Sequence, residues 1–344
     1  MPARMSWLGR VAGAAVLCLS LVSTASAANI ETVPVGNRGN APDATGFGAV
    51  DYNYRIGVCE VTAGQYTEFL NAVAATDPYW LYDTQMSSGG SGCQIQRLGS
   101  PGSYAYTVAP DWENRPVNFV SWGDAARFAN WLHNGQPTDP QGPGTTETGS
   151  YTLNGAVSDA DLRWIPRNPS ATWVIPSENE WYKAAYYDPA AGIYYKYPTG
   201  SDTMPGFVTS GGVLSTTGDP FIEGGVDLGN YATHNEDAGV QGIGGPYYRT
   251  EVGEWENSAS PYGTFDQGGN LWEWNEAMLY NLYRGIRGGT YHDKSYRMMS
   301  TDSAVSSPSS GYMDVGFRVG QIPEPATMGL LVLGGLAVLR RHKA

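Results

Sequence analysis

The 344-residue chain is acidic and rich in glycine and aromatic residues, with a formal net charge of −13, 45 glycines and 12% Phe, Trp and Tyr. An acidic surface repels phosphate backbones, and no basic cluster lies in the central part of the chain, so we expect no nucleic-acid partner. The central part has no linker, break in composition or internal repeat, and we therefore predict one large domain over residues 28–321.

The first 27 residues have the features of a secretory signal peptide. Two arginines precede an apolar run over residues 11–22, and Ala25-Ser26-Ala27 supplies the small residues that signal peptidase recognises. The alternative, an uncleaved anchor, needs roughly 20 apolar residues, and this run is shorter. We therefore predict cleavage after Ala27 and export of a chain that begins at Ala28.

Three segments are predicted to be helices because each follows a residue that can cap a helix N-terminus. They begin after Thr62, Ser121 and Ser177, and they should end near residue 73, near residues 133–135 and before residue 188. Thr62 with Gln65, and Ser177 with Glu180, have the spacing of a capping box. Apolar residues at helical spacing follow each cap, so each helix is expected to bury one face.

Outside these helices the chain has the composition of turns and loops. Gly, Pro, Ser, Thr and Tyr predominate, and short strand-like pieces occur at residues 173–175, 284–287 and 315–319. Residues 136–150 and 198–225 are predicted to form long surface loops. We therefore expect little regular secondary structure.

Two cysteines remain once the signal peptide, which contains Cys18, is removed. In an oxidising compartment free thiols seldom persist, so a disulfide between Cys59 and Cys93 is predicted. The alternative is two separate thiols, one buried and one in a loop, because the sequence does not fix the distance between them. A zinc site is not expected, since no histidine lies at ligand spacing from either cysteine.

Residues 322–344 mirror the signal peptide at the other end of the chain. Pro323-Glu324-Pro325 precedes an apolar stretch over residues 326–339 and a basic cluster over 340–343. This combination resembles the PEP-CTERM sorting signal. The resemblance implies transient membrane anchoring, cleavage by an exosortase-type enzyme, and delivery to the cell surface or extracellular polysaccharide. A simple C-terminal anchor remains the alternative.

Between the two ends, an ordered series of motifs resembles the formylglycine-generating enzyme, or sulfatase-modifying factor, domain family. The motifs are Cys59-Glu60-Val61-Thr62, Arg115-Pro116-Val117, Val120-Ser121-Trp122, Ile175-Pro176-Ser177-Glu178, Gly269-Asn270-Leu271-Trp272-Glu273-Trp274, Arg287-Gly288-Gly289-Thr290 and Gly316-Phe317-Arg318. The resemblance covers almost the whole of residues 28–321. It implies a single α+β domain with a C-type-lectin-like fold, about three short helices and short antiparallel strands.

The resemblance also locates the positions of the family's active site. Family oxidases hold copper(I) with two cysteines, and alignment without gaps on Gly288-Gly289-Thr290 places those positions at Asp293 and Met298. Aspartate is a hard ligand and methionine a weak one, so we expect neither copper nor oxidation of a substrate cysteine to formylglycine. His292 is a candidate for a polar binding role or for plain surface exposure.

A calcium site is the cofactor that the resemblance favours. It assigns the ligands to Asp266, Gly269, Leu271 and Glu273. Calcium accepts such mixed oxygen ligands, and glycines allow the chain to curl around the ion. A second family site would use Asn230 and Tyr231, but glycine replaces its aspartate at position 253, so that site is doubtful. The alternative for the first loop is a turn whose carboxylates only cap or face solvent.

Together these features predict an exported, calcium-stabilised protein that binds a ligand or associates with extracellular polysaccharide. The main alternative is an oxidase that modifies a secreted substrate through non-haem iron or copper, with His292 and Asp293 as hard ligands. Formylglycine formation ranks third. The sequence leaves open whether any catalytic activity remains.

Overall fold

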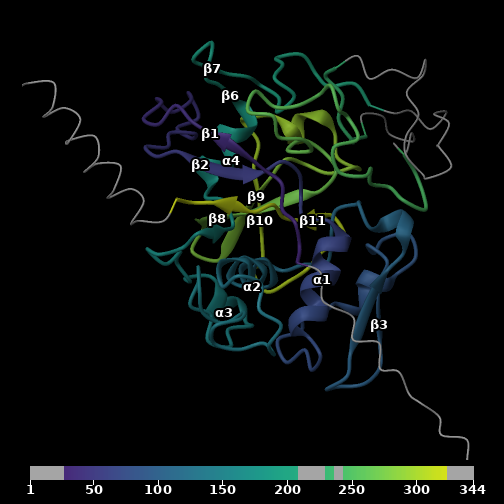
Figure 1. The fold of residues 1–344 in the computed structure, drawn as a ribbon. Helices are drawn as coiled ribbons and strands as arrows, with labels where there is room; N and C mark the ends of the chain where they lie inside the picture. The colour runs from purple at the N-terminus through teal and green to yellow at the C-terminus, as the bar shows by residue number, and fades with distance from the viewer. Residues whose placement is uncertain (1–26, 208–228, 236–242, 324–344) are drawn as a thin grey trace, which may run out of the picture.

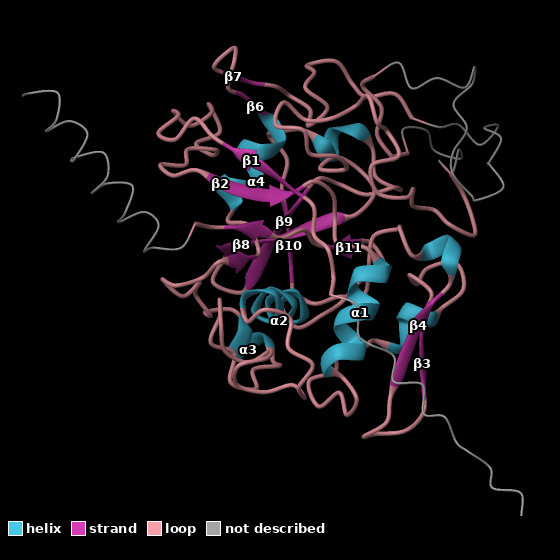
Figure 2. Cartoon of the chain, viewed as in Figure 1, coloured by secondary structure: helices cyan, strands magenta, loops and turns pink. Residues whose placement is uncertain are grey.

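The computed structural model describes residues 27–207, 229–235 and 243–323. The predicted signal peptide up to residue 26, residues 208–225 of the second predicted loop and the sorting segment from residue 324 lie outside the described residues. No helix in these ranges is long and apolar enough to cross a membrane. Figure 2 shows that loops connect nearly all of the short elements, as the composition predicts.

The described residues form four α-helices, three of which are the predicted ones. They are α1 (Ala63–Val73), α2 (Trp122–His133), α3 (Asp159–Leu162) and α4 (Glu178–Tyr186), with 3-10 turns η1 (Thr84–Ser87), η2 (Pro110–Trp112) and η3 (Ser295–Met298). Each predicted helix begins with a complete capping box, in which Thr62, Ser121 and Ser177 accept from the backbone amide three residues later. The four-residue α3 was not predicted.

Two four-stranded sheets form the centre of the domain (Figure 1). One has the order β1 (Thr32–Val35), β2 (Tyr54–Gly57), β12 (Gly320–Gln321) and β5 (Trp173–Val174), all antiparallel. The other has the order β10 (Ala304–Ser306), β9 (Tyr283–Arg287), β8 (Trp272–Leu279) and β11 (Val315–Gly316), in which the β8–β11 pair is parallel. Two hairpins, β3 (Ile95–Leu98) with β4 (Ala105–Val108) and β6 (Tyr187–Asp188) with β7 (Ile193–Tyr194), complete the fold.

Aromatic rings pack α1 and α2 against each other and against the segment that leads into β12. Phe69 of α1 meets Phe128 and Trp131 of α2 at ring-centroid distances of 5.3 and 5.2 Å. Phe317, just before β12, packs edge-on against Phe128 at 5.4 Å. All four rings are buried, so large side chains compensate for the scarcity of aliphatic residues in this core.

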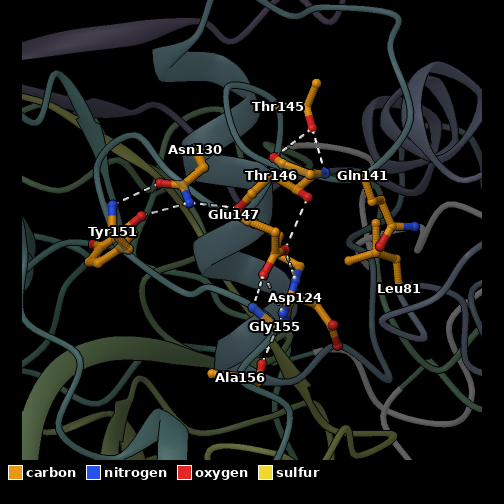
Figure 3. Close-up of polar contacts among 12 residues, drawn as sticks. Leu81, Asp124, Asn130, Gln141, Thr145, Thr146, Glu147, Tyr151, Gly155 and Ala156 are labelled. Atoms are coloured by element: carbon orange, nitrogen blue, oxygen red, sulfur yellow. Dashed lines mark hydrogen bonds and ion pairs between the residues drawn. The ribbon is translucent and has the colours of Figure 1, made fainter.

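The loop over residues 136–150, predicted to lie on the surface, is anchored in the interior through Glu147, whose contacts with Thr146 and Gly155 are drawn in Figure 3. Arg127 of α2 donates from Nε and Nη2 to the two carboxylate oxygens of Glu147, at 2.7 and 3.1 Å. Gly155 N and Thr146 Oγ1 also donate to this carboxylate. The prediction of a surface loop is therefore wrong for this end, because Glu147 serves as the counter-ion of a buried helix residue.

The predicted disulfide is also wrong. Cys59 and Cys93 are both free thiols. They lie in different surroundings: Cys59 follows β2 and faces Gly253, whereas Cys93 is fully buried between η1 and β3. The fold thus produces the alternative, two separate thiols.

Candidate functional site

The active-site region inferred from the family motif borders an open pocket of about 510 Å³. Its lining includes Ser91, Asn235, Tyr248, Tyr291, His292 and Met313, and we call it the tyrosine pocket. The rings of Tyr248 and Tyr291 are tilted at 42° with centroids 5.9 Å apart, and His292 packs edge-on against Tyr291 at 4.8 Å. The pocket therefore combines aromatic faces with amide, hydroxyl and imidazole groups, and no carboxylate belongs to the lining that the structure describes.

A fully buried arginine holds the wall of this pocket in place. Arg249 donates to the carbonyl oxygens of Ser91, Gly92 and Met313, at 3.2, 3.1 and 3.4 Å. Its guanidinium also lies 5.9 Å from the ring centroid of Tyr291. The Arg249 side chain thus connects its own segment to residues 91–92 and to residue 313, which lie far away along the chain. Sequence reasoning did not identify this residue or Tyr248, because their partners lie far away along the chain.

Asp293 and Met298, the positions predicted from the family motif to replace its cysteines, lie in different surroundings. Asp293 is on the partly exposed turn after Gly288-Gly289-Thr290, and its carbonyl oxygen accepts from Asn235 N at 2.8 Å. Met298 is fully buried in η3 and packs with Tyr197 and Ala232. Neither residue lines the tyrosine pocket.

His292 lies at the junction of several polar groups. Thr290 Oγ1 is 3.1 Å from both His292 Nδ1 and Asp293 Oδ2, and His292 Nε2 is 3.8 Å from Asp314 Oδ2. His292 is 45% exposed, so it is accessible to a ligand. In the described parts of the chain, no group of three or more His, Cys, Asp and Glu side chains is arranged to hold a metal ion.

Neither thiol resembles a metal-binding thiolate. Burial raises the pKa of both Cys59 and Cys93, and for Cys59 the neighbouring Asp266 carboxylate raises the pKa further. The guanidinium of Arg249 lowers the pKa of Cys93, but burial has the larger effect. A thiol must lose its proton to bind copper(I), so these two groups are poorly suited to that task.

The loop predicted to bind calcium adopts the expected curled shape. Asp266, Gly269 and Asn270 all have positive φ, at 58°, 81° and 57°. A Cβ on Gly269 would collide with the carbonyl oxygen of Thr233, so this turn requires glycine. Asp266 Oδ2 accepts from Gly253 N at 2.6 Å.

The predicted donor set is only partly available for a cation. The carboxylate of Glu273 accepts from Arg318 Nε and Nη2, each at 2.5 Å, and from Trp181 Nε1 at 2.7 Å. A guanidinium on this carboxylate opposes the approach of a second cation. Among the described residues, no cation is bonded to Asp266, and the buried Oδ1 of Asn270 has no hydrogen-bond partner. Calcium binding at this loop stays a prediction.

Glu60, which was not predicted as a site residue, belongs to the same cluster. Its carboxylate accepts from Asn270 Nδ2 at 3.0 Å and from Leu271 N at 3.2 Å. Burial, followed by the charges of Asp266 and Glu273, raises the pKa of Glu60 well above its usual range. Burial likewise raises the pKa of Asp266 to about 6. Three carboxyl groups near one guanidinium leave buried negative charge that a proton or a cation would neutralise.

The doubtful second calcium site has its donor oxygen engaged elsewhere. Asn230 Oδ1 accepts from Thr199 Oγ1 at 2.6 Å, and the ring of Tyr231 stacks on Trp255 at 5.6 Å. Gly253, at the position of the missing aspartate, donates to Asp266 instead. This hydrogen bond connects Gly253, from the predicted second site, to Asp266 of the first loop.

Comparison with protein families and solved structures agrees with this fold. Residues 49–321 match the family described as "Sulfatase-modifying factor enzyme 1-like domain", and residues 321–343 match the "PEP-CTERM protein-sorting motif". The second match indicates exosortase-type sorting of an exported protein. No curated protein sequence matches the chain.

Three solved structures illustrate the likeness. "Crystal Structure of CarF" is 21% identical, covers 86% of this chain and 99% of its own, and has a TM-score of 0.50. Treponema denticola variable protein 1 is 19% identical, with coverages of 85% and 95% and a TM-score of 0.48. PvdO from Pseudomonas aeruginosa is 16% identical, with coverages of 87% and 97% and a TM-score of 0.46. At such identity, the likeness to CarF concerns the fold alone.

Proposed function

We propose, from the premise that this chain belongs to the sulfatase-modifying factor enzyme 1-like domain family, that it is an exported surface protein which binds a saccharide of the extracellular polysaccharide. The proposed binding site is the tyrosine pocket. The observation that carries the proposal is the pair of tyrosine rings, Tyr248 and Tyr291, beside the polar groups of Ser91, Asn235 and His292. The apolar C–H face of a sugar packs on an aromatic ring, while its hydroxyls bond to amide and hydroxyl groups.

Two further observations support binding rather than thiol oxidation. The sorting motif at residues 321–343 belongs to exported proteins that are delivered to the cell surface. Asp293 and Met298 occupy the positions that the family's motif assigns to its two cysteines, and burial keeps the remaining thiols protonated. A linear two-sulfur copper site requires thiolates at these positions.

A glycan panel with the exported domain tests the proposal. Tyr248→Ala and His292→Ala should each weaken binding of the recognised saccharide by roughly tenfold, which corresponds to about 1.4 kcal/mol. Tyr280→Ala is the matched control, because Tyr280 is 79% exposed and lines none of the pockets described. A folded domain that binds no saccharide in the panel would overturn the proposal.

The rival function is an oxidase with iron or copper at His292 and Asp293. Elemental analysis of the purified domain distinguishes it from saccharide binding. The two side chains share Thr290 as a hydrogen-bond partner, which is the observation in favour of this rival. Iron or copper at one equivalent per chain would support the rival. Mass spectrometry of a cysteine-containing peptide tests formylglycine formation separately, and we expect its mass to be unchanged.

Calcium is proposed as a stabilising ion at the loop around Asp266. Three buried carboxyl groups, those of Glu60, Asp266 and Glu273, lie around the single guanidinium of Arg318, and among the described residues Asn270 Oδ1 has no hydrogen-bond partner; both observations support this proposal. Calcium should raise the unfolding temperature of the domain, and Asp266→Asn should remove that increase. An unfolding temperature that is unchanged by calcium would exclude the ion.

A further inference from the structure

A second hollow lies next to the tyrosine pocket, on the sheet formed by β10, β9, β8 and β11. It has a volume of about 560 Å³, and its lining includes Tyr283, Ser306, Ser307, Tyr312 and Asp314. We call it the sheet groove. Its lining also includes Trp272, which lies within the predicted calcium loop at residues 266–273, but no lining residue is one of the predicted calcium ligands or active-site positions.

The two hollows share one wall. Met313 lines the tyrosine pocket, while its neighbours Tyr312 and Asp314 line the sheet groove. Across this wall, His292 Nε2 of the pocket lies 3.8 Å from Asp314 Oδ2 of the groove. The residues at the wall are accessible, since Tyr312 is 43% and Met313 is 41% exposed. A single extended molecule can therefore contact both hollows by crossing this segment.

The groove repeats the chemistry of the pocket. Tyr283 and Tyr312 supply partly exposed rings, and Asp314 supplies a carboxylate that can accept hydrogen bonds from sugar hydroxyls. The hydroxyl of Ser307 is held by a hydrogen bond of 2.5 Å to Asp159 Oδ1, so its direction is fixed before a ligand arrives. Two adjacent sites with rings and hydrogen-bonding groups suit successive units of one carbohydrate chain.

We infer that the sheet groove is a second saccharide subsite and that the ligand is an oligosaccharide or polysaccharide chain crossing the segment Tyr312–Asp314. This inference rests on the proposed function, because the tyrosine pocket is the first subsite. Linking the two contacts in one molecule makes the second binding event intramolecular, so affinity must rise with chain length. A monosaccharide or disaccharide fills only one of the two hollows.

The test measures dissociation constants of the full exported domain for two length ladders. One ladder is neutral, from cellobiose to cellohexaose, and the other is acidic, from di- to hexagalacturonate. In the ladder that binds, we expect the hexasaccharide to bind at least about tenfold more tightly than the disaccharide. Equal affinity for all lengths would overturn the inference while leaving the proposed function intact.

Variants in each hollow then show which one is responsible for the dependence of affinity on chain length. Tyr283→Ala should weaken hexasaccharide binding by about tenfold without changing disaccharide binding, and Tyr248→Ala should weaken both. Tyr312→Ala serves as a second groove variant if Tyr283→Ala does not fold, and Tyr280→Ala should change neither affinity. If groove variants bind the hexasaccharide as tightly as the wild type does, the second subsite is refuted. If neither ladder binds at any length, the proposed function fails together with the inference.

Discussion

Replacing Glu147 by glutamine should lower the free energy of unfolding by about 3–5 kcal/mol, because it leaves the guanidinium of Arg127 buried without a counter-ion. The side chains of Arg127 and Glu147 are only 1% and 2% exposed, so water cannot take over the lost charge. The carboxylate also accepts from Gly155 N at 2.6 Å and from Thr146 Oγ1 at 3.1 Å. A glutamine amide supplies one acceptor oxygen for these donors instead of two.

Urea unfolding followed by tryptophan fluorescence measures the loss, with the slope m checked for constancy. Arg127→Met should cost a similar amount, and the double variant should cost less than the sum by roughly 2–3 kcal/mol because no unpaired charge remains. Arg297→Met is the control: its partner Asp302 lies at 3.3 Å, but the arginine is 38% exposed. Such surface pairs contribute about 0–1 kcal/mol. If the double variant loses as much unfolding free energy as the two single variants together, the cost does not come from an unpaired buried charge.

Three other predictions concern a buried carboxyl group, a glycine in a turn and the two cysteines. Burial raises the pKa of Asp124 to about 6 in the folded state, against about 3.9 in an unfolded chain, so its contribution to stability should grow as the pH falls from 7 to 4. The unfolding free energy of the wild type minus that of Asp124→Asn should therefore become more positive as the pH falls from 7 to 4. A difference that does not change with pH would contradict burial as the cause of the raised pKa. Gly269→Ala should cost more than about 2 kcal/mol, since its φ is +81° and a Cβ would meet a neighbouring carbonyl oxygen. Gly144→Ala, at φ +79° with open space around it, should cost only about 1 kcal/mol, and equal losses would show that the contact has no effect. Cys59 and Cys93 should both be alkylated in the unfolded protein without reductant, and a mass lower by two hydrogens would show a disulfide after all.

The helices could be predicted from the sequence because their signals are local. In each capping box the two partners are three residues apart, and the apolar face follows within the next turns. The three predicted strand-like pieces are confirmed as β5, β9 and β11, but the other strands were not predicted. Most have two to five residues, and β12 pairs with β2 and β5, which lie far away along the chain. Such pairing depends on long-range contacts that local composition does not encode.

The candidate site could be predicted only where a motif defines it. The motifs identified the loops at residues 266–273 and 288–293, but not the partners that decide their chemistry. Glu273 is a family calcium ligand in the motif, yet in the fold it pairs with Arg318, 45 residues later. The tyrosine pocket draws its walls from residues near 91, 248 and 313. Arg249 joins these segments, and its contacts are visible only in three dimensions.

The position of β12 determines how a mechanical pull on the C-terminal end would enter the domain. This two-residue strand lies between β2 and β5, and Ile322 N donates to Thr172 O at 2.8 Å just beyond it. Tension applied through Pro323 would therefore act first on an interior strand of the sheet and not on an edge strand. Because β2 and β5 flank β12 on both sides, rupture requires hydrogen bonds to break along two edges at once. A domain pulled through this end would therefore resist unfolding by shear.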